Sequence, residues 1–171
     1  MMKPWISLKM IFILLLLLGF SSAPVFAQSH STLTPLLGNL SGWQAEKAEG
    51  MSMDAGGMRM INATRSYAKG SRELNAVVMV GSQAMTMGQM QQMKMETNEV
   101  RVNIESINGF QVSSSYNKQE KSGGIMVMLG GNQTSGAIFM LNFEGMDDHQ
   151  ALKLAKKFDW QAMKKATAKL F

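Results

Sequence analysis

The sequence contains no cysteine among its 171 residues. Thiol catalysis, zinc–thiolate sites, iron–sulfur clusters and cysteine-linked haem are therefore excluded. Disulfide bonds, on which small exported domains often depend, are excluded as well, and so is a bacterial lipid anchor, which is attached to a cysteine. The fold must be stabilised by its hydrophobic core.

Histidine is nearly as scarce, with only His30 and His149 in the chain. A Ser-His-Asp triad would have to use His149, and no G-x-S-x-G sequence is present to hold a nucleophilic serine. Asp147 and Asp148 precede this histidine, but three adjacent residues at a predicted helix start do not converge on one ion, so helix capping is favoured. The sequence therefore predicts a protein that is not an enzyme and has no catalytic residues.

The start of the chain has the pattern of a secretory signal peptide. Lys3 and Lys9 form a basic start, an apolar run extends from Met10 to Phe20, and Val25 and Ala27 stand where a signal peptidase cleaves. The run is shorter than the roughly 20 residues of a membrane-spanning helix. We expect cleavage after Ala27, a periplasmic or secreted location and no transmembrane segment in the mature chain. Retention of the leader as an anchor is the alternative.

The net charge of +5 includes two lysines of the leader, which leaves +3 on the mature chain. Six lysines follow His149 and predict the solvated face of terminal helices. Nucleic-acid binding would call for basic residues interleaved with aromatic ones, so we expect no nucleic-acid partner. Contact of the basic surface with anionic lipid is the alternative.

Alternating and continuous apolar runs predict about six strands. They span residues 58–67, 72–80, 99–106, 110–116, 125–129 and 136–143. Helices are predicted in the methionine-rich stretch and after Asp147 and Asp159, whose side chains are suited to capping. The fold class is therefore α+β, an antiparallel β-sheet covered by helices on one face.

The expected organisation has three parts. Residues 1–27 form the signal peptide, and residues 28–44 form an N-terminal tether or short helix. Residues 45–171 form a single α+β domain, in which residues 45–57 are expected to be a loop or an irregular edge because of their charge and glycine content.

The dipeptide Asn108-Gly109 lies between two alternating runs and favours a two-residue type I′ turn. That turn would pair Ile104 with Ser113 and place the apolar residues of the two strands on opposite faces. A three-residue loop that begins one residue earlier would pair Ile104 with Val112 and keep them on one face. We therefore predict the longer loop, with a bulge at its glycine.

Methionine is in clear excess, with 15 residues in the mature chain. The stretch MTMGQMQQMKM from Met85 to Met95 is predicted to be helical. In such a helix Met87, Met90 and Met93 share a stripe about 120° wide, outside which the two terminal methionines fall. Thioethers are soft ligands that suit Cu(I) and Ag(I), so a soft-metal site is one interpretation.

Three sulfurs from a single helix would be strained around one small ion, because about 9 Å of helix rise separates the first from the last. Ligands from the region 51–60 would have to complete the site. The candidate metal ligands are Met87, Met90, Met93, Met85, Met53, Met58 and Met60. Cu(I) or Ag(I) is the candidate metal, and no other cofactor is expected.

Three other interpretations of the methionines stay open. Methionine fills irregular core space in place of leucine. It also forms adaptable apolar surfaces, in which case the partner would be an envelope protein or an amphiphile, and it scavenges oxidants as the sulfoxide. Under each of these interpretations the sequence predicts an exported, non-enzymatic binding or accessory protein.

Export and methionine richness together resemble the periplasmic copper-handling proteins, and this resemblance is one of composition. The mature chain is also similar to a group of small exported bacterial proteins in Gly42-Trp43, Arg65-Ser66-Tyr67 and Phe158-Asp159-Trp160. The second resemblance implies export and the α+β fold, and it implies no activity.

Overall fold

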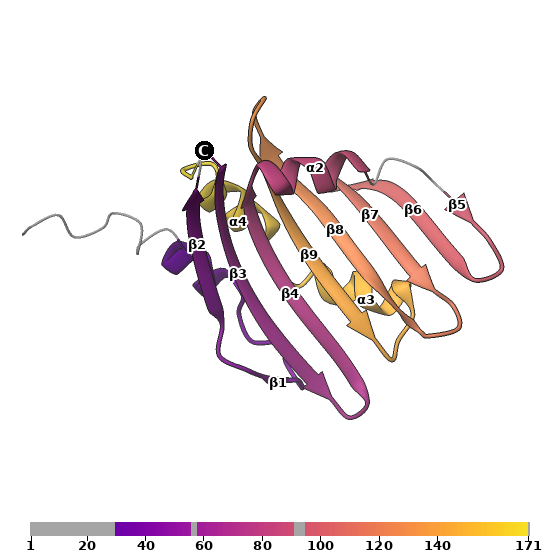
Figure 1. Cartoon of the computed structure of the whole chain (residues 1–171). Coiled ribbons are helices and arrows are strands. Elements are labelled where there is room, and N and C mark those ends of the chain that lie inside the picture. Colours follow the sequence, from indigo (N-terminus) through magenta and orange to yellow (C-terminus); the bar gives the residue numbers. More distant parts are fainter. Residues whose placement is uncertain (1–29, 56–57, 91–94, 171) are drawn as a thin grey trace, which may run out of the picture.

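The computed structural model describes residues 30–55, 58–90 and 95–170 of the chain. The predicted signal peptide lies outside these residues. The described residues form one antiparallel sheet with helices packed on both of its faces (Figure 1). Within these ranges no helix is both long enough and apolar enough to cross a membrane.

The described part of the chain contains nine strands, in the order β1-β3-β4-β9-β8-β7-β6-β5, with β2 also paired to β3. The first four are β1 (Gln44–Ala45), β2 (Glu49–Ala55), β3 (Met58–Lys69) and β4 (Arg72–Gly81). The other five are β5 (Met95–Glu96), β6 (Val100–Ile107), β7 (Phe110–Asn117), β8 (Ser122–Gly131) and β9 (Gly136–Glu144). The antiparallel sheet is confirmed, but the prediction of about six strands is wrong.

The strands that the sequence did not indicate lie at the edges of the sheet. β1 and β2 follow each other along β3, and β5 pairs with β6. β1 begins at the end of the predicted tether, and β2 lies in the segment expected to be a loop or an irregular edge. The sequence of β2 is EGMSMDA, whose glycine and acidic residues disfavour a strand. Every residue from Glu49 to Ala55 nevertheless has a partner in β3, so pairing with a long neighbour outweighs local propensity.

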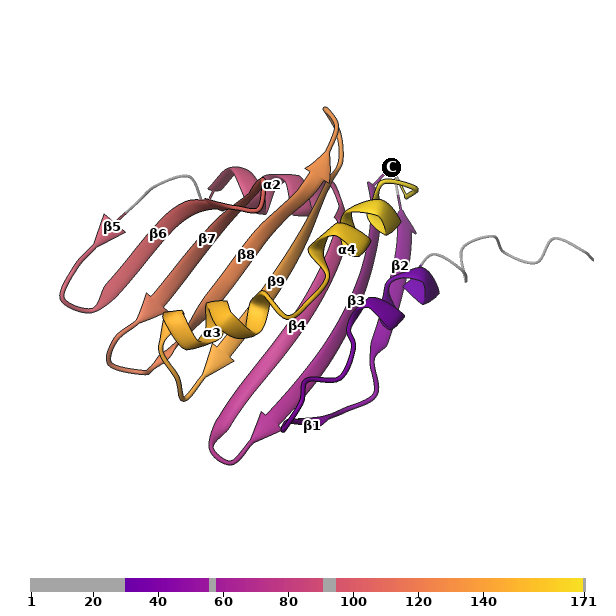
Figure 2. The same cartoon turned by 180° about the vertical axis from the view of Figure 1, so that it is seen from behind.

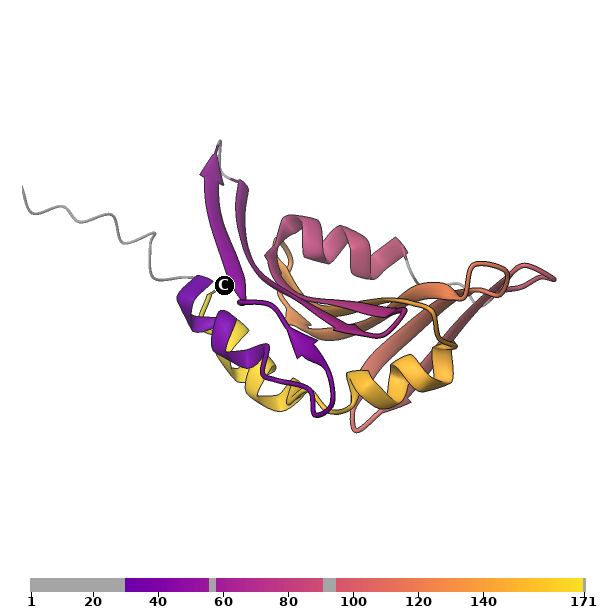
Figure 3. The same cartoon turned by 90° about the horizontal axis from the view of Figure 1, so that it is seen from below.

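Helices cover both faces of the curved sheet (Figures 2 and 3). The 3-10 helices η2 (His30–Thr32) and η3 (Thr34–Leu36) lie on the convex face with α3 (Asp148–Ala155) and α4 (Trp160–Thr167). Helix α2 (Ser82–Met90) lies on the concave face. The prediction of helices on one face is therefore wrong. The central strands carry apolar residues on both faces, and both faces therefore need cover.

The main hydrophobic core lies between the convex face and its helices. Val78, Phe139 and Leu141 of the central strands are fully buried there. Leu33 and Leu37 are also fully buried, so the segment before β1 is packed into the core. This packing fixes the N-terminal segment against the sheet.

Asp147 and Asp159 cap α3 and α4, as predicted. The Asp147 carboxylate accepts a hydrogen bond from the backbone N–H of Gln150 at 2.7 Å, and Asp159 accepts one from Ala162 at 2.8 Å. These bonds satisfy N–H groups that have no partner within the helix.

The turn between β6 and β7 is the two-residue turn Asn108-Gly109. Its residues have φ of 51° and 80°, as a type I′ turn requires. Ile104 is opposite Ser113, so the prediction of a three-residue loop is wrong. That prediction assumed a single apolar face, whereas Ile104 points to the concave face and Val112 to the convex core.

Candidate functional site

The concave face carries a second hydrophobic cluster. Directly opposite residues of antiparallel strands point to the same face of a sheet. Met79 is opposite Ile138, and Met140 is opposite Met126, so these four share the face that α2 covers. In this cluster Ala84, Met126 and Ile138 are buried, and Met79, Met87, Met128 and Met140 pack half-buried against them. We call Met79, Met126, Met128, Ile138 and Met140 the methionine-rich face.

Helix α2 packs closely on this face because glycines leave it room. A Cβ on Gly136 would lie 2.8 Å from the backbone nitrogen of Met85. A Cβ on Gly88 would collide with the sulfur of Met128, which explains a glycine in a helix that it weakens by about 1 kcal/mol. Ala84 of α2 is fully buried.

Three of the methionines predicted to bind a soft metal belong to α2. Met87 packs in the second cluster, and Met85 is half-buried. The helix ends at Met90, whose side chain lies outside the described part, and Met93 lies outside the described residues altogether. The predicted stripe therefore stays a prediction, and the packing of Met87 supports the role of core filler for that residue.

The other predicted ligands come from β2 and β3. Met53 is directly opposite Met60, and the register places both, with Met51, on the face that carries Met79. Met58 begins β3, and its side chain lies outside the described part. The pairing of β2 with β3 therefore brings together Met51, Met53 and Met60, which lie within nine residues of one another in the sequence.

Among the methionines whose side chains the structure describes, three are exposed to a degree that core packing does not explain. Met51 and Met53 on β2 are 49% and 50% exposed, and Met95 on β5 is 50% exposed. Met95 is opposite Val102, which the register also assigns to the concave face. Exposed methionines therefore stand at both edges of the concave face.

An open pocket of about 690 Å³ lies at the end of the concave face away from α2. Its polar lining comes mainly from Glu46, Glu73 and Glu144, with Asn75 and Asn142 beside them, and none of its lining residues is basic. We call it the acidic pocket.

Glu73 and Glu144 are directly opposite each other on neighbouring strands. Like charges in this position destabilise a sheet, by a few tenths of a kcal/mol up to about 1 kcal/mol. Among the described residues neither carboxylate has an ion-pair partner. The arrangement leaves negative charge concentrated in the pocket.

Arg65 and Tyr67 of β3 hold the N-terminal segment that supplies Glu46. Arg65 Nε donates to the carbonyl oxygen of Glu46 at 2.8 Å, and Tyr67 Oη donates to that of Gly38 at 2.7 Å. Burial raises the pKa of Tyr67 to about 12, an effect that the nearby Arg65 opposes. Tyr67 therefore stays protonated at neutral pH and keeps its donor.

No group of three or more histidine, aspartate or glutamate side chains within the described residues is placed to hold a metal ion. Asp148 pairs instead with Arg101, at 3.1 Å, and His149 is exposed at the start of α3. These positions agree with the capping interpretation of the segment that contains them.

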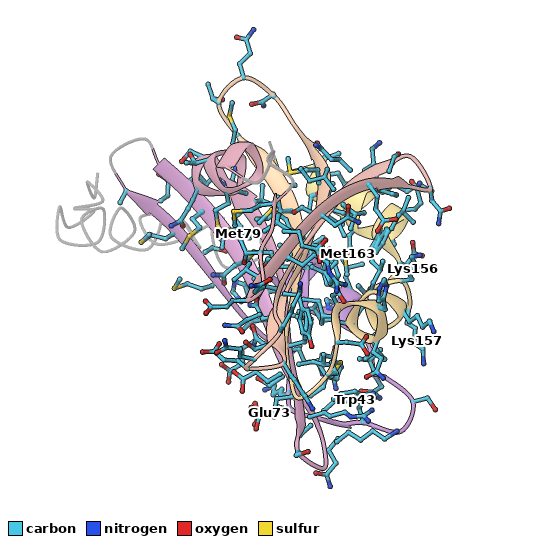
Figure 4. The ribbon with its side chains drawn as sticks, turned by 90° about the vertical axis from the view of Figure 1, so that its right-hand side faces the viewer. Trp43, Glu73, Met79, Lys156, Lys157 and Met163 are labelled. Carbon is cyan, nitrogen blue, oxygen red and sulfur yellow. The ribbon has the colours of Figure 1, made fainter. Side chains whose placement is uncertain are left out.

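The lysines around α3 and α4 lie on the face opposite the acidic pocket. Figure 4 shows Glu73 and Met79 on one side of the sheet and Lys156 and Lys157 on the other. Lys156 and Lys157 lie between α3 and α4, and the two helices themselves carry Lys153, Lys164 and Lys165. Because these lysines lie on the other side of the sheet, they do not stand between the acidic pocket and a positively charged group that approaches the concave face.

No pattern in the sequence indicates Glu46, Glu73 or Glu144 as site residues. Each is an isolated acidic residue near a strand end. Glu73 and Glu144 come together because β9 pairs with β4, and Glu46 joins them because β1 pairs with β3 beside β4. Only the strand order could have revealed them.

Comparison with protein-family models yields no match to this chain, and comparisons with curated proteins and with solved structures yield none either. Function is therefore inferred from the geometry of the concave face.

Proposed function

We propose that this chain is an exported, non-enzymatic binding protein that holds a cationic amphiphile on its concave face. The apolar part lies on the methionine-rich face beside α2, and the cationic group lies in the acidic pocket. The observation that carries the proposal is that the acidic pocket and the methionine-rich face lie one after the other along the same strands.

Strand β4 illustrates the succession. Glu73, Asn75, Val77 and Met79 are alternate residues and point to the same face. From Glu73 to Met79 the strand rises about 20 Å. A ligand that reaches both surfaces is therefore elongated, with a charged end and an apolar end.

The chemistry of each surface supports the same ligand. Methionine side chains are flexible and polarisable, and they adapt to apolar groups of different shape. The pocket carries three carboxylates and no basic residue, and its volume of about 690 Å³ falls within the range of sites for small molecules. That volume favours an amphiphile over an envelope protein as the partner.

The test is a calorimetric titration of the chain without residues 1–27, below the micelle concentration of each ligand. Dodecyltrimethylammonium is compared with dodecanoate, which has an anionic head, and with tetramethylammonium, which has no tail. We expect the cationic amphiphile to bind at least about tenfold more tightly than either, a difference of about 1.4 kcal/mol.

The double variant Glu73→Gln, Glu144→Gln tests the pocket, and Glu105→Gln on the opposite face is the matched control. We expect the double variant to weaken binding of dodecyltrimethylammonium about tenfold or more and the control to leave it unchanged. Equal affinity for the cationic and anionic ligands would contradict the proposal. So would binding of a basic polypeptide with no binding of the amphiphile.

A further inference from the structure

We infer a second site on this chain, for a soft monovalent cation of the Cu(I) or Ag(I) kind, formed by the thioethers of Met51, Met53 and Met60. It lies on β2 and β3 at the edge of the sheet, and it does not depend on the proposed amphiphile. The site takes its ligands from the region 51–60 that the sequence suggested as a contributor, and it uses a strand pair in place of the helical stripe.

The register of β2 and β3 brings the three side chains together. Met53 is directly opposite Met60, and the Cβ atoms of such a pair lie about 5 Å apart. Met51 is two residues before Met53, on the same face and about 7 Å along the strand. The three side chains therefore start from a small triangle on one surface.

The side chains have the reach to converge on one ion. Methionine has three rotatable bonds and no branch, so the sulfurs are free to turn inward from that triangle. A single helix spreads its methionines along the axis, whereas this strand pair sets two of them side by side. The geometric strain that a helical site would impose is absent here.

The exposure of Met51 and Met53 also supports a binding role for these side chains. Met51 and Met53 are 49% and 50% exposed on an edge strand, where apolar side chains invite aggregation. Met60 is half-buried and would anchor the ion to the sheet. In contrast, Met87 of α2 is already engaged in packing.

The chemistry of the donors selects the metal. Neutral thioethers favour Cu(I) and Ag(I) over hard cations. No cluster of three or more acidic or histidine side chains in the described ranges competes for Zn²⁺ or Mg²⁺. A soft monovalent cation is thus the chemical class that this set of donors fits.

The test is titration of the chain without residues 1–27 with silver nitrate in chloride-free buffer, followed by NMR of ¹³C-labelled methionine methyl groups. We expect the methyl signals of Met51, Met53 and Met60 to shift together and to saturate at one equivalent. A parallel titration with Cu(I) under a competing chelator, without oxygen, compares the affinity of the site for copper with its affinity for silver.

The triple variant Met51→Leu, Met53→Leu, Met60→Leu removes the sulfurs and nearly conserves volume. We expect it to weaken Ag(I) binding at least about tenfold, whereas the matched variant Met79→Leu, Met128→Leu, Met140→Leu retains binding. Should the triple variant fail to fold, Met53→Leu alone, at an exposed position, must still weaken binding. Equal Ag(I) affinity of the two triple variants, or methyl shifts confined to other methionines, would overturn the inference. Amphiphile titration of the same variants reports on the proposed function separately.

Discussion

Methionine occupies three different environments in this protein. Met163 is fully buried in the convex core, Met126 is buried under α2, and Met51 and Met53 are about half exposed. One flexible, unbranched side chain suits all three environments. The residue type alone therefore does not determine the role of a given methionine. The register of the strands assigns each strand methionine to one face of the sheet.

At the residue scale, Tyr67→Phe tests the anchor of the N-terminal segment. The substitution removes the hydrogen bond to Gly38, so we expect the free energy of unfolding at pH 7 to fall by about 0.5–1.5 kcal/mol. Urea denaturation measures this change.

The difference in unfolding free energy between the unsubstituted protein and Tyr67→Phe is expected to depend on pH. Burial raises the pKa of Tyr67 from 10.0 to about 12 in the folded chain, so the unfolded chain loses this proton first as pH rises. The contribution of Tyr67 is therefore intact below pH 10 and disappears as the pH approaches about 12. We expect the stability advantage over Tyr67→Phe to shrink across this interval. A constant difference would contradict the assignment.

Glu73→Gln separates stability from binding. It removes one of two like charges that face each other across β4 and β9, so we expect it to raise the free energy of unfolding by about 0.2–1 kcal/mol. The same change should weaken binding of dodecyltrimethylammonium. Loss of both stability and binding would instead indicate a structural role, with Glu105→Gln as the comparison in urea denaturation.

At the element scale, the β6–β7 turn depends on its glycine. Gly109 has φ of 80°, a conformation that costs an L-residue about 1–2 kcal/mol, and we expect Gly109→Ala to lower the free energy of unfolding by about that amount. Gly38→Ala is the matched control, because no atom lies within 4 Å of its added Cβ. Thermal unfolding followed by circular dichroism compares them, and equal effects would refute the turn assignment.

Local signals predicted the elements that depend on local chemistry. The caps of α3 and α4 follow from Asp147 and Asp159, and the long strands follow from alternation or continuous apolar runs. The sequence did not predict strand β2, because its own composition disfavours a strand and its pairing with β3 is what stabilises it. The turn register was misjudged since a second apolar face was not foreseen.

At the scale of the whole molecule, the fold presents two unlike faces. The convex face is covered by helices that carry lysines, and the concave face combines a methionine-rich surface with an acidic pocket. The acidic residues of that pocket could not be predicted, because they meet through the distant pairings of β4 with β9 and of β1 with β3. Among the methionines of the concave face, Met53 and Met60 were candidates from the sequence, whereas Met79, Met126, Met128 and Met140 were not.

The most direct test of the binding face is NMR of ¹³C-labelled methionine methyl groups during titration with dodecyltrimethylammonium. We expect shifts at Met79, Met128 and Met140, which are half-buried on the concave face. Met163, fully buried in the convex core, should stay unchanged. Shifts confined to methionines of the convex side would contradict the proposed binding face. Binding of the ligand with no shift at any methionine of the concave face would contradict it as well.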